Sequence, residues 1–311
     1  MTEHEIADAT LPSVVTVGCA NFESIPGDKA KSLEKLLSVT RDAARQGCDL
    51  VVFPELAINT WGTCADCAAE HHPCAWHIEQ AELAHGPSSS AVARLAAELD
   101  IHVIYGFEER DAEEPAVLYN AAAVVAPEGV LGTYRKLHLG IPLETDRFTP
   151  GSSLPVFQTR LGPIGVQICY DFYCGPELSR LLALKGARLL VNPTGRSALP
   201  HAMENLEAAT LVRAQENLVY AASANRVGVS GETPWAGGSV IGGPSFPGFA
   251  QVRAQAGRGE ELIVATLNYN QLAAWYDWLP WRDWRLGAQL PITELVQEEF
   301  AALVESARSA S

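Results

Sequence analysis

Two kinds of hydrophobic pattern alternate along the chain. Short apolar stretches rich in β-branched residues, such as SVVTVGCANF at positions 13–22, are typical of buried β-strands. Positions 27–47 place apolar residues three or four apart, which is typical of an amphipathic helix. Asp28 can cap the start of this helix, and Gly47 follows its end. The first part of the chain therefore predicts a strand followed by a helix.

The same alternation continues to position 268. Strands are predicted at 49–56, 101–109, 118–127, 129–139, 162–171, 187–193, 218–228, 237–243 and 261–268. Helices are predicted at 88–100, 176–186 and 201–217. No linker or internal repeat interrupts the pattern, so we expect an α/β fold with layers of helix on sheet. Two packed sheets with helices outside would also fit, and the pattern alone does not choose between these arrangements.

Composition and charge narrow the class of protein. The 311 residues are 48% hydrophobic, which is ample for a packed core, and the formal net charge is −15. An acidic surface repels phosphate backbones and anionic lipids, so we expect neither nucleic-acid nor membrane-surface partners. No apolar run approaches the roughly 20 residues that a membrane-spanning helix needs.

The cysteines and the start of the chain bear on location. The start, MTEHEIADATLP, lacks a basic segment followed by an apolar one, so no secretory signal is expected. Seven cysteines is an odd number, which favours reduced thiols over a disulfide framework. We therefore expect a cytoplasmic protein.

Three polar residues lie where buried strands end. Glu55 follows DLVVFP, Lys136 follows GVLGTYR and Cys169 follows GPIGVQI. Each alone has an ordinary structural interpretation, namely a turn glutamate, a surface lysine and a packed cysteine. Together they suggest chemistry, because strand ends in α/β sheets form ligand crevices and a thiol needs a base or a cation to act as a nucleophile. Glu55 could be that base, and Lys136 could be that cation.

Longer motifs around these residues resemble one known family. VVFPELAINTWG, GTYRKLHL and GVQICYDF are similar to the Glu, Lys and Cys motifs of the nitrilase superfamily of carbon–nitrogen hydrolases. LETDRFTPG, RAQENLVYAASANRVG and GGSVIGGP continue the likeness in the family's order, so that it covers roughly residues 13–270. The resemblance implies a four-layer α-β-β-α sandwich, hydrolysis of a C–N bond through a thiol, and no cofactor.

The resemblance also implies a role for each residue. Cys169 would be the nucleophile, Glu55 the general base, and Lys136 the group that stabilises the oxyanion. Glu144 falls at the family's second glutamate and would orient Lys136 or the substrate amine, whereas its ordinary interpretation is an exposed loop acid. The backbone N–H of Tyr170 could assist Lys136 at the oxyanion. Glu55 would protonate the leaving amine and then activate water against the thioester.

The residues after the nucleophile bear on the substrate. Cys169-Tyr170-Asp171 is similar to the amidase branches, whereas family nitrilases typically have Cys-Trp-Glu at this place. We therefore expect a small carboxamide that releases ammonia rather than a nitrile. N-carbamoyl compounds remain the nearest alternative, because an arginine that many family amidases carry in this turn is absent.

Further residues are candidates for the pocket wall. His138 lies two positions after Lys136 and could either line the pocket or pack in the core. Asn192 and Arg196 belong to the strand end VNPTGR, where Arg196 could bind a substrate carboxylate or lie on the surface. Cys174, a second thiol near the nucleophile, is expected in the pocket wall.

The stretch CADCAAEHHPCAWH contains residues of the types that bind metals. Cys64, Cys67, Cys74 and His77 could bind zinc tetrahedrally. They are crowded into one short loop without a second spaced pair, so we predict no metal site and favour an insertion at the pocket mouth. The non-enzyme alternative is a catalytically silent scaffold or metal-binding module on the same fold, and the three intact candidate catalytic residues argue against it.

The C-terminal region places a tryptophan at every third position: Trp275, Trp278, Trp281 and Trp284. Pro280 excludes a continuous helix interior, so an extended or 3₁₀-like path is predicted. These side chains could pack on their own domain or anchor a partner subunit, and the family resemblance favours the partner. We therefore expect a hydrolase domain at 1–270, a C-terminal extension at 271–311 near an oligomer interface, and a homodimer or larger homo-oligomer.

Overall fold

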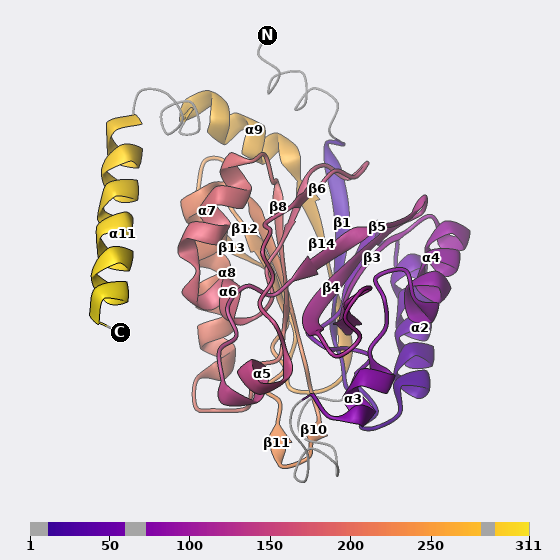
Figure 1. Ribbon diagram of the computed structural model, residues 1–311. Helices are drawn as coiled ribbons and strands as arrows, with labels where there is room; N and C mark the ends of the chain where they lie inside the picture. The colour runs from indigo at the N-terminus through magenta and orange to yellow at the C-terminus, as the bar shows by residue number, and fades with distance from the viewer. Residues whose placement is uncertain (1–11, 60–72, 281–289, 311) are drawn as a thin grey trace.

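Two six-stranded sheets form the centre of the protein, for which a computed structural model describes residues 12–59, 73–280 and 290–310 (Figure 1). The first sheet contains, in spatial order, β14 (Glu261–Asn268), β1 (Val14–Asn21), β2 (Leu50–Val52), β3 (His102–Arg110), β4 (Leu118–Ala126) and β5 (Gly129–Arg135). The second contains β13 (Gln251–Gln255), β12 (Val240–Gly243), β9 (Tyr220–Asn225), β8 (Leu189–Thr194), β7 (Ile164–Val166) and β6 (Val156–Phe157). Each sheet has three parallel strands, β1–β2–β3 or β7–β8–β9, with antiparallel strands on both sides.

Helices cover the outer face of each sheet (Figure 1). They are α2 (Lys29–Arg45) and α4 (Pro87–Leu99) on the first sheet, and α7 (Pro176–Leu184) and α8 (Ala202–Asn217) on the second. Because side chains alternate across a strand, Val52 of β2 joins the core between the sheets while Val51 joins the core beneath α2 and α4. The layers therefore form an α-β-β-α sandwich, which confirms the expected fold class and selects the arrangement with two packed sheets.

Several short elements gather at one end of the sandwich. These are α3 (Ala75–Gln80), α5 (Pro142–Arg147) and the two-stranded pair β10 (Val229–Ser230) and β11 (Thr233–Pro234), near the bottom of Figure 1. A further short helix, α6 (Tyr170–Cys174), follows β7. None of these was predicted, because helices of five or six residues are too short to show a periodic pattern.

The predicted extended path of the tryptophan region is wrong for its first half. Residues 269–278 form helix α9, in which the Asn268 side chain accepts from the N–H of Asn270 and caps the first turn. The helix ends at Trp278, so Pro280 lies beyond its end rather than inside it. Trp275 is buried and donates from Nε1 to Ser245 O at 2.6 Å, so it packs on its own chain.

The rest of this region is only partly described. Trp278 is 65% exposed, and Trp281 and Trp284 lie outside the described residues. A last helix, α11 (Leu290–Ala310), follows and was not predicted. No helix in the described ranges is both long enough and apolar enough to cross a bilayer.

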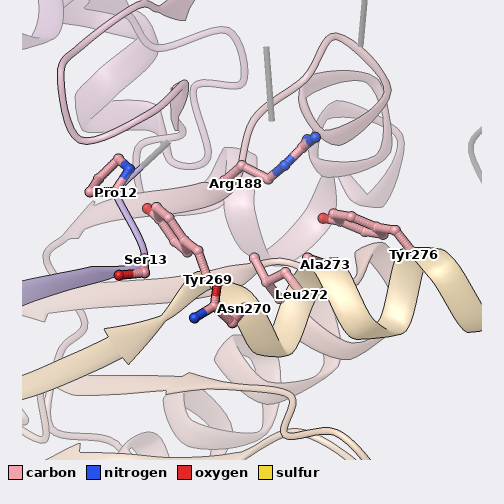
Figure 2. Close-up of a pocket in the computed structure, with 8 residues that line it drawn as sticks. All are labelled: Pro12, Ser13, Arg188, Tyr269, Asn270, Leu272, Ala273 and Tyr276. Atoms are coloured by element: carbon pink, nitrogen blue, oxygen red, sulfur yellow. The ribbon is translucent and has the colours of Figure 1, made fainter. Parts of the chain in front are cut away.

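A small cavity lies where α9 meets the start of β1 (Figure 2). Its volume is ≈ 60 Å³, and Tyr269, Arg188 and Tyr276 line it together with Ser13. It contains none of the residues that the sequence nominated for chemistry. The candidate site therefore lies elsewhere, at the ends of the parallel strands.

Candidate active site

Glu55 lies in a turn directly after β2 and is fully buried. This turn packs closely on β3, because a Cβ at Gly106 would clash with the backbone of Glu55 and Leu56. From the second sheet, buried Arg226 donates from Nη1 to the carbonyl oxygens of Glu55 and Leu56, at 2.9 and 2.8 Å. Both sheets therefore fix the backbone of Glu55, and the N–H of Gly195 donates to its Oε2 at 2.9 Å.

Lys136 follows β5, and its buried ammonium group bridges two carboxylates. Nζ lies 2.8 Å from Glu55 Oε1 and 2.6 Å from Glu144 Oε1. Glu144 comes from the first turn of α5 and also accepts from the N–H of Gly140 at 2.8 Å. Asn120 of β4 donates from Nδ2 to the same oxygens of Glu55 and Glu144, at 2.7 and 3.1 Å. The result is one buried network that joins the ends of β2 and β5 to Asn120 of β4 and to α5.

Two carboxylates share one ammonium group in this network. The excess negative charge shifts the pKa values of Lys136 and Glu144. Burial alone would lower the pKa of Lys136, but the charges of Glu55, Cys169 and Glu144 outweigh it and raise that pKa, so the ammonium stays protonated. Burial and the charge of Glu55 raise the pKa of Glu144, against the opposing effect of Lys136. Perturbed groups of this kind are typical of functional sites.

Cys169 lies between β7 and α6 in a strained backbone conformation, with φ 48° and ψ −99°. Such angles are uncommon outside glycine and concentrate at functional sites. The N–H of Cys169 donates to Asn192 Oδ1 at 3.0 Å, so the end of β8 holds the turn. Burial and the charge of Glu55 raise the pKa of the thiol to about 12, while Lys136 and a hydrogen bond with Thr194 oppose the shift. The thiol is therefore protonated at neutral pH and needs a base before it can attack.

Buried Asp171 connects the nucleophile turn to the strand that carries Lys136. Its Oδ2 accepts from the Tyr134 hydroxyl at 2.6 Å, and its Oδ1 accepts from the backbone N–H of His138 at 2.7 Å. The ring Nδ1 of His138 also lies 2.9 Å from Oδ1, so this histidine is engaged with Asp171. These contacts fix Lys136 relative to Cys169.

A pocket of ≈ 360 Å³ opens beside Cys169. Residues 195–197 after β8, residues 199–202, and Asn205 in α8 form the rest of its wall. Arg196 lines this pocket, whereas Asn192 is fully buried and supports the backbone of Cys169. Tyr170 is 42% exposed, and its N–H, at the first position of α6, has no acceptor within that helix.

The proposed zinc ligands are only partly described. Cys64 and Cys67 lie outside the described residues. Cys74 is buried just before α3, and His77 Nδ1 lies 3.0 Å from Glu108 Oε1. Within the described ranges, no three side chains of metal-binding type are grouped to hold an ion.

Four residues of the site were missed by the sequence analysis: Asn120, Asp171, Thr194 and Arg226. Asn120 is a single amide in an otherwise apolar strand, and this interruption is a signal that could have found it. Thr194 and Asp171 lie at strand ends beside residues that were nominated. Arg226 belongs to a stretch that carries the family resemblance, but its role was not predicted, because its contacts come from the opposite sheet.

Comparison with known proteins agrees with this architecture. Residues 16–277 match the family model described as carbon-nitrogen hydrolase. The chain is 33% identical over 264 residues to an (R)-stereoselective amidase from Pseudomonas sp., covering 84% of this chain and 88% of that protein. It is 32% identical over 238 residues to a probable nitrilase from Schizosaccharomyces pombe, covering 74% of this chain and 80% of that protein.

A solved structure is similar as well. The amidase from Nesterenkonia sp. AN1, in complex with butyramide, superposes with a TM-score of 0.69 at 25% identity. The match covers 84% of this chain and 93% of that chain. Since the family model spans most of the sequence and the fold agrees, the chain belongs to the carbon-nitrogen hydrolase family, in the amidase-like part of the nitrilase superfamily.

Proposed function

We propose that this carbon-nitrogen hydrolase converts small carboxamides to the acid and ammonia, with Cys169 as the nucleophile. The observation that carries the proposal is the strained Cys169 beside an open pocket. The charges of Glu55, Lys136 and Glu144 act on the pKa of its thiol. Relatives and a structural neighbour named as amidases support the choice of amide.

The first half of the reaction forms a thioester. Glu55 takes the proton from the Cys169 thiol while the sulfur attacks the amide carbonyl carbon. The carbonyl oxygen becomes negative, and the Lys136 ammonium and the N–H of Tyr170 stabilise it. The C–N bond then breaks, Glu55 returns the proton to nitrogen, and ammonia leaves. Because the pKa of the thiol is raised to about 12, proton transfer to Glu55 has to accompany the attack.

The second half restores the enzyme. Ionised Glu55 takes a proton from water, and the hydroxyl oxygen attacks the thioester carbon. The same donors stabilise the second oxyanion. The C–S bond breaks, the sulfur regains a proton from Glu55, and the carboxylic acid leaves. Glu144 does not exchange protons with the substrate in this scheme; it positions Lys136.

The experiment compares kcat/KM for the amide, nitrile and N-carbamoyl derivatives of one carbon skeleton, repeated over several skeletons. We expect the amide to be the best substrate, and mass spectrometry to trap the acyl group on Cys169. Faster turnover of the nitrile on several skeletons would contradict the amidase assignment. Faster release of carbon dioxide from the N-carbamoyl compound would replace it with that activity.

Alkylation tests Cys169 without a known substrate. Iodoacetamide carries an amide group, so it should bind beside Glu55 and label Cys169 much faster than the other cysteines. Glu55→Gln should slow this labelling strongly, because the base is lost while the shape is kept. Equal, slow labelling of all seven cysteines would remove Cys169 from the mechanism.

We also propose a homo-oligomer in which the C-terminal extension lies at the interface. Six exposed apolar side chains lie along α11, either adjacent or three to four residues apart: Ile292, Leu295, Val296, Phe300, Leu303 and Val304. Trp278, Leu181 of α7 and Val212 of α8 are also exposed. Apolar area of this extent is typical of a surface that another subunit covers.

Light scattering tests the oligomer. Deletion of residues 290–311 should lower the molar mass from that of an oligomer towards that of one chain. Deletion after Asn270 would be a poorer test, because it also removes buried Trp275. An unchanged mass would mean that α11 does not contribute to the interface.

A cytoplasmic location completes the proposal. The described cysteines are free thiols, and the reaction needs Cys169 in its reduced state. Fractionation of the native cells should recover amidase activity with cytoplasmic markers. Recovery with exported proteins would contradict this part.

A further inference from the structure

Thr194 is a fully buried threonine at the end of β8, next to the nucleophile. The carbonyl oxygen of the preceding residue, Pro193, accepts from the N–H of Cys169 at 3.1 Å, so this backbone contact brings Thr194 to the nucleophile turn. The Thr194 hydroxyl makes a hydrogen bond with the side chain of Cys169. Neither half of the reaction described above uses this hydroxyl, although it contacts the reacting sulfur.

Tyr173 of α6 holds the Thr194 side chain, because its hydroxyl oxygen lies 3.2 Å from Thr194 Oγ1. Tyr173 is itself fixed in two ways. Arg213 of α8 donates to the carbonyl oxygens of Phe172 and Tyr173, at 3.0 and 3.2 Å. The guanidinium carbon of Arg196 lies 4.3 Å from the centre of the Tyr173 ring. Both the backbone and the ring of Tyr173 are therefore held in place.

The direction of these hydrogen bonds follows from the number of protons that each hydroxyl carries. Burial and the charge of Cys169 raise the pKa of Tyr173, so its hydroxyl keeps its proton at neutral pH. A hydrogen bond with Asn192 opposes this rise in the pKa, which means that Asn192 donates and the Tyr173 oxygen accepts. Tyr173 can therefore donate its single proton to Thr194 Oγ1, and the single proton of Thr194 is left for the sulfur.

We propose that Thr194 is a further catalytic residue, whose hydroxyl donates a hydrogen bond to the Cys169 sulfur whenever that sulfur carries negative charge, and that Tyr173 positions this hydroxyl. The inference rests on the proposed amidase function. When Glu55 takes the thiol proton, Thr194 stabilises the sulfur until its electron pair has formed the S–C bond. When the C–S bond of the thioester intermediate breaks, the pair returns to the sulfur, and Thr194 stabilises it until Glu55 returns the proton. Thr194 keeps its own proton throughout.

The first test removes the hydroxyl and keeps the shape of the side chain. Thr194→Val should lower kcat for an amide and the rate at which iodoacetamide alkylates Cys169, each by about 10- to 100-fold, because hydrogen bonds to charged groups are strong. KM should change less than kcat, because the lost contact is to the sulfur and not to the substrate. Thr194→Ser keeps the hydroxyl and should retain most of both rates. If Thr194→Val does not fold, Thr194→Ala compared with Thr194→Ser gives the same test.

A double-mutant cycle tests the role of Tyr173. Tyr173→Phe should slow alkylation of Cys169 by about 3- to 10-fold, because the Thr194 hydroxyl loses the group that orients it. In the Thr194→Val background the same substitution should have no further effect, since Tyr173 acts through Thr194. A purely structural role would give equal effects in the two backgrounds, and that result would overturn the positioning role of Tyr173.

The matched control is Thr40→Val, because Thr40 is also fully buried and its hydroxyl donates to Leu36 O at 2.9 Å within α2. Both rates should stay unchanged in this variant, and thermal unfolding shows whether each variant is folded. Wild-type rates of turnover and alkylation in folded Thr194→Val would overturn the inference and leave the amidase proposal intact. If the wild-type enzyme hydrolyses no amide while Thr194→Val still slows alkylation, the proposed function fails and the contact of Thr194 with the sulfur is supported.

Discussion

Two buried groups of ionisable side chains lie beside each other and differ in their balance of acidic and basic residues. In the first, Lys136 contacts both Glu55 and Glu144. In the second, Glu108 contacts Arg147 Nη1 at 3.3 Å and His77 Nδ1 at 3.0 Å. All of these residues are nearly inaccessible to solvent. We call them the lysine group and the arginine group.

The two groups are physically connected. Helix α5 carries Glu144 in its first turn and Arg147 in its last, so each group holds one end of it. Glu108 of β3 pairs directly with Asn120 of β4, whose side chain contacts both carboxylates of the lysine group. The arginine group can therefore affect the position of Glu144 without contacting the pocket.

The difference between the groups separates a reactive site from a structural one. In the lysine group two carboxylates compete for one cation, which raises the pKa of Glu144, and a pocket with a thiol lies next to it. In the arginine group one carboxylate faces an arginine that stays charged, and none of its members lines the pocket beside Cys169. Excess negative charge shifts a pKa in the lysine group, as is typical of sites that transfer protons. The matched pair of Glu108 and Arg147 instead holds α5 in place.

The largest expected effect is on the lysine group. Lys136→Met should lower kcat by about 10³-fold, because the oxyanion loses its cation. The fold should survive, since Glu144 can bind a proton once Lys136 no longer opposes it. Steady-state rates and thermal unfolding measure the two effects. Lys31→Met, at an exposed ion pair, is the control, and near-normal kcat in Lys136→Met would disprove the role of the ammonium group.

The residue between the groups should give a smaller effect. Asn120→Ala removes two hydrogen bonds to the carboxylates and should lower kcat by about 10-fold, because Glu55 and Glu144 lose a positioning contact. KM should change less than kcat, since Asn120 does not line the pocket. Measurement of both constants decides this. A change in KM alone would place Asn120 in substrate binding instead.

The contrast between the groups also explains what the sequence could predict. Glu55, Lys136 and Cys169 were found because each directly follows a recognisable apolar strand, and strand order brings such ends together. Asn120 and Arg226 escaped notice, because their roles depend on pairing between distant strands and on packing between sheets. The amide that interrupts β4 marks Asn120 as unusual, but no local pattern shows which residues it contacts, because long-range register leaves no such pattern in one sequence.

The tryptophan region shows a different limit. A spacing of three residues and a nearby proline suggested an extended path, yet Tyr269–Trp278 is helical because Asn268 caps it and Pro280 lies beyond its end. Burial of Trp275 against Ser245, about thirty residues away in the chain, outweighs the local spacing. A proline marks a helix end more reliably than it excludes the helix before it.

Mutation of the arginine group should affect stability more than rate. Glu108→Ala should lower the free energy of unfolding by about 3 kcal/mol, because Arg147 and His77 lose a buried carboxylate partner. The fall in kcat should stay below about 10-fold, because Glu144 keeps its contact with Lys136. Urea unfolding and steady-state rates test both numbers. A loss of rate as large as that of Lys136→Met, without destabilisation, would mean that the two groups do not differ as described.

The smallest expected effect is the pH dependence of stability contributed by Glu144. Burial and the charge of Glu55 raise the pKa of Glu144 above its ordinary value of 4.5, so the folded state binds this proton more tightly than the unfolded state does. As pH rises from that ordinary value through the folded pKa, ionisation of Glu144 therefore costs stability. Glu144→Gln removes the cost, so its unfolding free energy relative to wild type should increase with pH across this window and then level off. Urea unfolding between about pH 4 and pH 8 measures the trend. In a Glu55→Gln background the trend should shrink, because the charge of Glu55 no longer raises the pKa of Glu144. An undiminished trend would show that burial alone raises that pKa.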